Sequence, residues 1–236
     1  MGSDSAKREL LKALEEKARR KRYTLIKQMF PETGPYRREL YPKHMEFFRA
    51  GSLHRERLFM AANRVGKTVA GGCELTYHMT GDYPEWWDGA RFDRAVQCLA
   101  AGDTSSTTRD IIQKKLLGGI WGTPEFGTGL IPGHTLMKPT PGRGVANLYE
   151  EITVRHVSGG TSRLMLRSYE QGRKIFQGTE QDFIWLDEEV PKNVYDEALI
   201  RTMTTQGLVA ITFTPLAGLT ELVIDFLEAR HEQVPL

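Results

Sequence analysis

Short apolar runs alternate with amphipathic segments through most of this 236-residue chain. Helix patterns at residues 68–79 and 103–117 each follow such a run, and further helix patterns follow the last two runs. Alternation of this kind predicts the α/β fold class, with a mostly parallel sheet flanked by helices. The runs expected to form its buried strands are residues 58–62, 95–101, 183–186 and 208–213.

Segments outside this alternation predict additional elements. Residues 152–157 and 164–169 are separated by the sequence Ser-Gly-Gly-Thr, which predicts a hairpin of paired strands. Glycine and proline are dense between residues 118 and 144, so we expect an irregular loop excursion there.

The N-terminal part of the chain is predicted to be helical. Residues 5–28 place leucines at helical spacing among many charged residues, which is typical of an amphipathic helix. Its basic run, residues 19–22, fits either an arm that binds DNA or a partner, or a solvated helix face. An extended connector at residues 31–42 and a short helix at residues 44–50 are expected to follow.

Composition restricts the function classes. The chain has 32 Lys and Arg against 30 Asp and Glu, so any nucleic-acid contact must come from local clusters rather than from net charge. Cys73 and Cys98 lack metal-binding spacing, which favours neither a zinc site nor a disulfide framework, and fits a reducing compartment. The sequence contains neither a signal-like N-terminus nor an apolar stretch long enough for a bilayer, so we expect a cytoplasmic protein without a membrane partner.

Residues 61–68 follow a predicted strand and open a predicted helix, which is the context that a phosphate-binding P-loop requires. Gly66 permits close backbone approach, and loop N–H groups at a helix N-terminus can hold phosphate oxygens. Lys67 neutralises phosphate charge, and Thr68 offers a hydroxyl ligand to Mg²⁺. Ala61 replaces the first glycine of the usual pattern, so a strand–turn–helix corner with a chance Gly-Lys-Thr is the alternative. The predicted nucleotide-binding residues of this loop are Ala62, Asn63, Arg64, Val65, Gly66, Lys67 and Thr68.

A second apolar strand, residues 183–186, ends in three consecutive carboxylates. In a parallel sheet, Asp187 at its carboxyl end lies near the P-loop, where it can hold Mg²⁺ together with Thr68. Glu188 is predicted to polarise the attacking water as general base. Glu189 fits a carboxylate at a helix N-terminus or on the surface.

A third strand, residues 208–213, ends in hydroxyl residues and is followed by Pro215. Together these motifs resemble the ATPase domain of large terminase subunits, the DNA-packaging motors of tailed bacteriophages. The resemblance extends over about residues 41–227. The segments that carry it are residues 60–68, 168–173, 176–180, 185–189 and 213–215.

The resemblance implies a P-loop NTPase fold of the ASCE/RecA-like type that uses ATP and Mg²⁺. It also implies translocation of double-stranded DNA into a procapsid in the cytoplasm of an infected bacterium, by a homo-oligomeric ring that works with portal protein and the small terminase subunit. Thr212 and Thr214 would couple hydrolysis to movement. The implied organisation is a helical arm and connector over residues 1–40, the ATPase domain over 41–228, and over 229–236 the start of a linker to an absent RNase H-like nuclease domain.

Several roles implied by the resemblance have plainer alternatives. Tyr41 and His44 occupy the segment that contacts adenine in related motors, but His44 replaces a glutamine and also fits a helix-surface histidine. Arg64 would sense the γ-phosphate in catalysis or stabilise the loop by pairing with a carboxylate. Arg143 would act as a catalytic arginine finger for a neighbouring subunit, or is a solvated loop residue.

Contacts to DNA phosphates, without base specificity, are expected from basic side chains that are each also compatible with plain surface charge. Two other functions remain open at this point: a helicase-like DNA translocase, and an assembly module that binds ATP without hydrolysing it. The residues predicted to contact phosphates are Lys114, Lys115, Arg167, Arg173 and Lys174.

Overall fold

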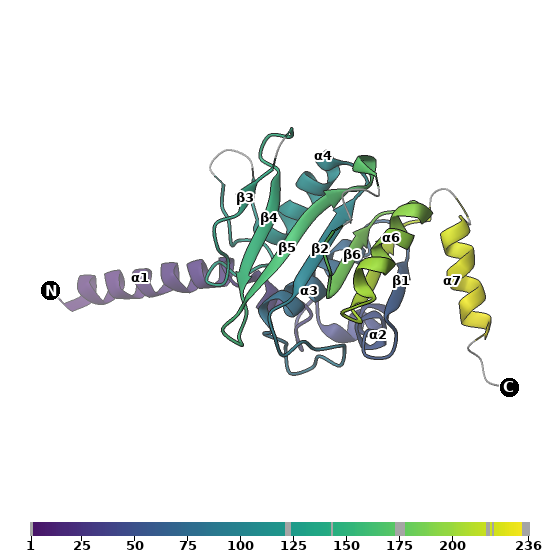
Figure 1. The fold of residues 1–236 in the computed structure, drawn as a ribbon. Coiled ribbons are helices and arrows are strands. Elements are labelled where there is room, and N and C mark those ends of the chain that lie inside the picture. The colour runs from purple at the N-terminus through teal and green to yellow at the C-terminus, as the bar shows by residue number, and fades with distance from the viewer. Residues whose placement is uncertain are drawn as a thin grey trace.

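The computed structural model describes residues 2–120, 124–142, 144–172, 178–215, 218 and 220–232. Within these residues the chain forms a seven-stranded sheet with the strand order β1-β7-β6-β2-β5-β4-β3 (Figure 1). The strands are β1 (Glu56–Met60), β2 (Gln97–Gly102), β3 (Thr140–Pro141), β4 (Tyr149–Arg155), β5 (Thr161–Ser168), β6 (Phe183–Asp187) and β7 (Leu208–Phe213).

The sheet is mostly parallel, as the sequence predicts. Strands β1, β7, β6, β2 and β5 run in one direction, and β4 and β3 form an antiparallel edge. The predicted hairpin is confirmed as the β4–β5 pair, although both strands begin three residues earlier than expected. The register places Asp187 beside Thr212 and Met60 beside Phe213, so β1, β6 and β7 end at the same edge of the sheet.

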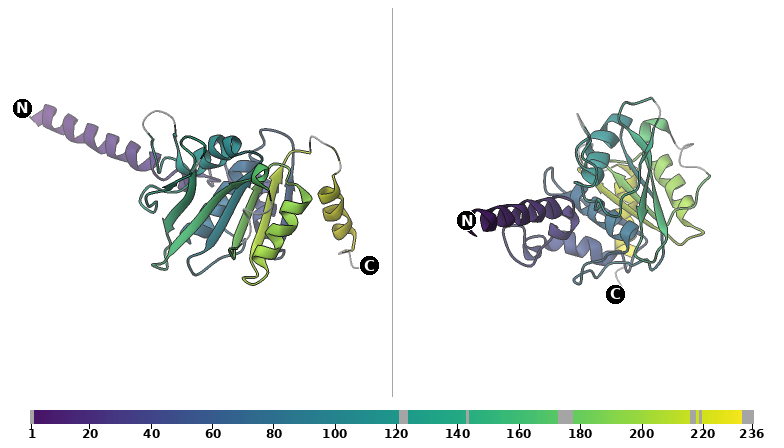
Figure 2. Two further views of the ribbon diagram at one scale, coloured as in Figure 1. Left: turned by 45° about the horizontal axis from the view of Figure 1, so that its top comes forward. Right: turned by 90° about the vertical axis from the view of Figure 1, so that its left-hand side faces the viewer.

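Helices cover both faces of the sheet (Figure 2). Because side chains alternate along a strand, Phe183 and Trp185 of β6 belong to the core under α3, whereas Ile184 and Leu186 belong to the core under α6. The longer helices are α1 (Gly2–Arg22), α2 (Pro42–Ala50), α3 (Lys67–Thr80), α6 (Lys192–Thr202) and α7 (Glu221–Glu232).

The helix predicted at residues 103–117 is present, but its middle turn is widened. It consists of α4 (Ser105–Thr107), a π-helical segment η3 (Thr108–Gln113) and α5 (Lys114–Leu117). The buried Gln113 side chain donates to the carbonyl of Asn147 and accepts from the N–H of Tyr149, both at 2.7 Å. This pair of bonds fixes the helix to the start of β4. The expected irregular excursion follows the helix and contains the short strand β3.

The N-terminal arm departs from the prediction. Helix α1 ends at Arg22 rather than near residue 28, and it projects away from the sheet (Figure 1). Leu25–Gln28 instead forms the separate 3-10 helix η1, because Ile26 and Phe30 turn into the main core. The sequence predicts an extended connector, but residues 32–36 form bends and a turn, in which the N–H of Arg38 donates to the carbonyl of Pro31 at 2.8 Å, and the 3-10 helix η2 (Arg38–Leu40) follows. Among the described helices, none combines the length and apolar character that a membrane span needs.

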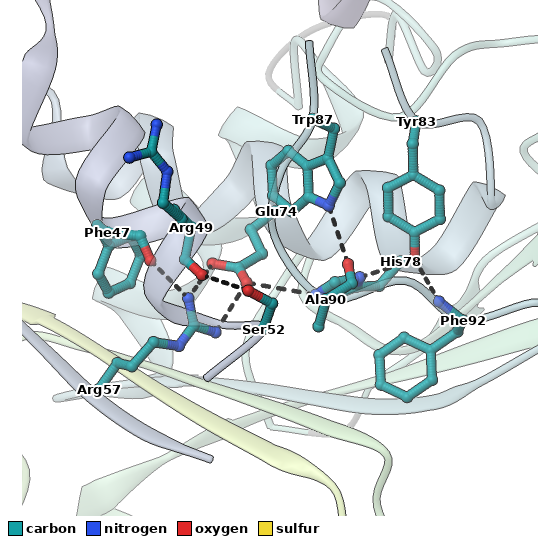
Figure 3. A network of polar contacts seen from close by, with 10 residues as sticks. All are labelled: Phe47, Arg49, Ser52, Arg57, Glu74, His78, Tyr83, Trp87, Ala90 and Phe92. Atoms are coloured by element: carbon teal, nitrogen blue, oxygen red, sulfur yellow. Dashed lines mark hydrogen bonds and ion pairs between the residues drawn. The ribbon is translucent and has the colours of Figure 1, made fainter. Parts of the chain in front are cut away.

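A buried polar network holds α3 in place (Figure 3). Arg57 of β1 makes two hydrogen bonds to the carboxylate of Glu74, at 2.7 and 3.1 Å, and both side chains are almost fully buried. The Tyr83 hydroxyl accepts from the N–H of Phe92 at 2.8 Å and lies 2.9 Å from His78 Nδ1. Because the Glu74 carboxylate can only accept, His78 presents its Nε2 proton to Glu74 at 3.4 Å, and its Nδ1 can then accept from Tyr83. The helix that begins at Lys67 is thereby anchored to β1 and to the loop before β2.

Candidate functional site

The loop between β1 and α3 turns sharply at two left-handed residues. Arg64 has φ 63°, and Gly66, which precedes the first residue of α3, has φ 93°. Glycine suits the second position, because the left-handed region is sterically costly for other residues. The first turn of α3 then continues from the carbonyl of Gly66, which accepts from the N–H of Ala70 at 2.9 Å. The loop therefore presents its backbone N–H groups beside a helix N-terminus.

Lys67 lies at the centre of this loop and is buried. Its ammonium group donates to the carbonyl of Ala62 at 2.7 Å and to the hydroxyl of Thr214 at 2.8 Å. Thr214 donates in turn to Asn63 Oδ1 at 2.8 Å. Residues just beyond β7 are thus hydrogen-bonded to two residues of the loop.

Asp187 faces the same loop from the end of β6. The Thr68 hydroxyl lies 3.1 and 3.2 Å from its two carboxylate oxygens, although the residues are 119 positions apart. The Thr212 hydroxyl donates to Oδ1 at 2.6 Å and accepts from the Trp185 indole N–H at 2.8 Å. Only 2% of the Asp187 surface is exposed. The sequence-predicted ligands Thr68 and Asp187 therefore converge, and Thr212 orients the carboxylate.

Burial raises the pKa of Asp187 to about 6. Hydrogen bonds from Thr212 and Thr68 and the charge of Lys67 act against this shift, whereas the negative charge of Glu188 adds to it. A poorly solvated carboxylate beside a hydroxyl is a donor set of hard oxygen atoms, and it fits Mg²⁺. The same surroundings fit a divalent cation because its charge would offset the cost of keeping Asp187 ionised.

Glu188 follows at a left-handed position, with φ 71°. Its N–H donates to the carbonyl of Thr212 at 2.8 Å, so the backbone of the carboxylate segment is fixed to β7. A non-glycine residue in this conformation is uncommon and frequently marks a functional site. Glu188 and Glu189 are both partly exposed.

The other residues predicted to belong to the nucleotide site lie in different environments. His44 is buried, with 6% of its surface exposed, so its interpretation as a helix-surface histidine is wrong. Tyr41 is partly buried against Phe30 and His44. Arg64 is exposed, and within the described residues it has no carboxylate partner. Arg143 lies outside the described residues.

The basic residues predicted to contact DNA occupy different environments. Arg167 is largely covered: it donates to the carbonyl of Leu166 at 2.9 Å and pairs with Glu150 at 3.6 Å. Lys114 is exposed, whereas the stem of Lys115 packs near Gly72 of α3. Arg173 and Lys174 lie outside the described residues.

Two aromatic residues at the site were not predicted to take part in it. The Trp185 indole reaches Thr212 only because Gly71 of α3 has no side chain: a Cβ there would lie 2.3 Å from the indole nitrogen. The buried Tyr169 hydroxyl lies 3.1 Å from the carbonyl of Ala101 and 2.9 Å from that of Asp187. Tyr169 belongs to one of the sequence motifs, but nothing in the motif indicates that its hydroxyl fixes the end of β6.

A mostly parallel sheet with a glycine–lysine–threonine turn after β1, and a carboxylate at the end of β6, which β7 separates from β1, defines a P-loop NTPase fold. Residues 58–235 match the family model described as terminase large subunit, T4likevirus-type, N-terminal. The chain therefore belongs to the terminase large subunit family.

Individual relatives agree with this assignment. The large terminase subunit of Salmonella phage P22 is 33% identical over 243 residues, a match that covers 96% of this chain and 47% of that protein. This chain thus spans about half the length of that relative. A solved structure of the large terminase from a thermophilic bacteriophage, in complex with ADP, shares the fold with a TM-score of 0.54 at 14% identity. That match covers 81% of this chain and 42% of the thermophilic phage protein.

Proposed function

We propose that this chain is an Mg²⁺-dependent ATPase motor domain that moves double-stranded DNA into a procapsid. The observation that carries the proposal is the meeting of Lys67, Thr68 and Asp187 at one edge of the sheet, from segments 119 residues apart. Family membership supports DNA packaging rather than strand separation. The large terminase of the thermophilic bacteriophage forms a complex with ADP, which supports an adenine nucleotide here.

The phosphate end of the proposed site combines three kinds of group. The left-handed turn at Gly66 directs N–H groups toward phosphate oxygens, and Lys67 supplies the positive charge. Two of the three Lys67 ammonium protons are directed at Ala62 and Thr214, which leaves one for a phosphate oxygen without breaking either bond. Arg64, exposed within the same loop, is proposed to contact the γ-phosphate.

Thr68 and Asp187 would hold the Mg²⁺, which neutralises phosphate charge when bound. Glu188 is proposed to orient the attacking water and accept its proton, because it adjoins Asp187 and is partly open to solvent. Thr212 and Thr214 would transmit the state of the site to β7. Arg143 remains a proposed arginine finger, outside the described residues.

The wider activity is proposed from membership of the family. Contacts to DNA would be made to phosphates, since packaging must tolerate every sequence. Portal protein, the small terminase subunit and the procapsid are the proposed partners of a homo-oligomeric ring, in the cytoplasm of an infected bacterium.

ATP turnover by the purified chain tests the proposal. Wild type should hydrolyse ATP with Mg²⁺ and stop in EDTA. Lys67→Ala and Glu188→Gln should each lose about a hundredfold or more in turnover, since each removes a group that acts on the reacting phosphate. Lys43→Ala and Glu32→Gln, which change exposed charges, serve as matched controls.

Unchanged turnover in both site variants would refute the assigned site. DNA movement is tested separately on the full-length packaging complex, by displacement of a triplex-forming strand from duplex DNA. Unwinding of the duplex during ATP hydrolysis would favour a helicase-like translocase instead.

A further inference from the structure

His44 lies directly against the P-loop rather than beside an open base-binding surface. It occupies the first turn of α2, and only 6% of its surface is exposed. Its ring packs edge-on against Phe59 at 5.0 Å and Tyr41 at 5.3 Å between centroids, and at a tilt of 48° against Phe30 at 5.7 Å. The aromatic neighbours leave little of the imidazole available to a nucleotide base.

The uncovered edge of the ring is directed at the left-handed turn. His44 Nε2 lies 3.1 Å from the point that a Cβ on Gly66 would occupy, and no other group lies closer to that point. Burial lowers the pKa of His44, while hydrogen bonding to the backbone of Val65 and Gly66 acts in the opposite direction. Burial therefore favours the neutral ring at pH 7, and the tautomer that carries its proton on Nε2 points this N–H at the loop backbone.

Helix α2 is itself fixed at its other end. Arg57 donates to the carbonyl of Phe47 at 2.9 Å, and the same guanidinium makes the buried pair with Glu74 of α3 (Figure 3). The helix that carries His44 and the helix that the loop opens are consequently joined through one arginine. His44 therefore contacts the loop from a helix whose position relative to α3 is fixed by Arg57.

We infer that His44 is a positioning residue: it holds the turn at Gly66 in the conformation that binds phosphate, and it does not recognise adenine. The inference rests on the proposed function of this loop. Two left-handed residues, one of them the non-glycine Arg64, give a turn that surrounding contacts must maintain. Holding it before the nucleotide arrives strengthens binding, because less ordering remains to be done on association.

Nucleotide affinities of variants at this position separate positioning from base recognition. His44→Leu removes the ring N–H and places an apolar side chain among the aromatic neighbours. His44→Gln keeps an N–H donor of similar reach. Dissociation constants for ATP, GTP and ADP are measured by calorimetry with Mg²⁺. His44→Leu should weaken all three by about three- to tenfold, the loss expected for one hydrogen bond, with the ATP/GTP ratio unchanged. His44→Gln should stay within about twofold of wild type for each.

Amide hydrogen exchange of the folded protein tests whether His44 orders the P-loop in particular. A side chain that only filled space in the core would not affect exchange in this loop alone. Peptides that cover residues 61–68 should exchange faster in His44→Leu, whereas peptides from β2 and β5 should not change. Arg49→Ala, an exposed change on the same helix, is the control and should leave both measurements at wild-type values.

Three results would overturn the inference. The first is a fall in ATP affinity without a fall in GTP affinity in His44→Leu, and the second is a stronger preference for ATP over GTP in His44→Gln than in wild type. The third is unchanged amide hydrogen exchange of residues 61–68 in His44→Leu. If His44→Leu fails to fold, the ATP/GTP ratio of His44→Gln still decides between the two roles. Failure of the proposed function is distinguishable, because wild type itself would then bind none of the three nucleotides.

Discussion

Asp187→Asn should make the metal-free protein more stable and inactive at the same time. The carboxylate is placed where burial raises its pKa from 3.8 to about 6. A rise of roughly two pKa units corresponds to about 3 kcal/mol of free energy that the fold gives up to keep Asp187 ionised. Asparagine has almost the same shape and can still accept from Thr212, so it avoids this cost while keeping that hydrogen bond.

The sign of the effect fixes its pH dependence. Because the folded-state pKa lies above the unfolded-state value, the destabilisation by Asp187 is absent below about pH 4 and complete above about pH 7. The stability gain of Asp187→Asn should therefore be about 3 kcal/mol at pH 7.5, or about 6–12 °C in melting temperature, and roughly half as large at pH 5. Urea unfolding in EDTA across this pH range measures it.

A control comes from the residue just before the same strand. Asp182 is also buried, but it accepts two hydrogen bonds from Arg94 and one from the N–H of Gln97. Asp182→Asn should therefore destabilise the protein. The reasoning would be refuted if Asp187→Asn were less stable than wild type at pH 7.5, or if its gain did not change with pH. Adding Mg²⁺ and nucleotide should restabilise wild type more than Asp187→Asn, because ligand binding to the folded state adds stability by mass action.

Two further predictions concern the packing behind the site. Glu74→Gln should lower stability by about 3–5 kcal/mol, because it leaves Arg57 buried without its charge partner, whereas replacing both residues by apolar ones should recover much of the loss; thermal unfolding measures both. Gly71→Ala should cost about 1–3 kcal/mol and shift the fluorescence of Trp185, because the added methyl overlaps the indole. Gly119→Ala, where the nearest atom would be 3.8 Å away, is its control, and equal behaviour of the two variants would contradict the packing argument.

Most of the sheet could be predicted because its signals are local. Residues 183–186 and 208–213 are apolar on both faces, as buried parallel strands must be, and both are confirmed as strands. The meeting of Lys67 with Asp187 could also be expected, because strands of one parallel sheet end at the same edge.

What the sequence did not indicate depends on contacts between distant segments. Nothing near His44 shows that its ring lies against Gly66, since that contact requires the packing of α2 on α3. The hydrogen bond from Trp185 to Thr212 requires that residue 71, on the helix α3 that covers β6, be glycine, because a Cβ there would overlap the indole. The apolar stripe of α1 predicted a helix correctly, but the stripe does not pack on the sheet: Leu10 is 62% exposed. Periodicity predicts the helix and not the surface that its apolar side contacts.

Thr212, in β7, and Thr214, just after it, each bind one of two oppositely charged groups of the site. Thr212 donates to the carboxylate of Asp187, and Thr214 accepts from the ammonium group of Lys67. A ligand that changes the separation of these charges is expected to change at least one of the two bonds, and through that bond the end of β7. This geometry is the physical basis for proposing Thr212 and Thr214 as the coupling residues. Amide exchange in residues 208–214 should therefore change when Mg²⁺ and ATP bind, and a change confined to the P-loop would contradict that role.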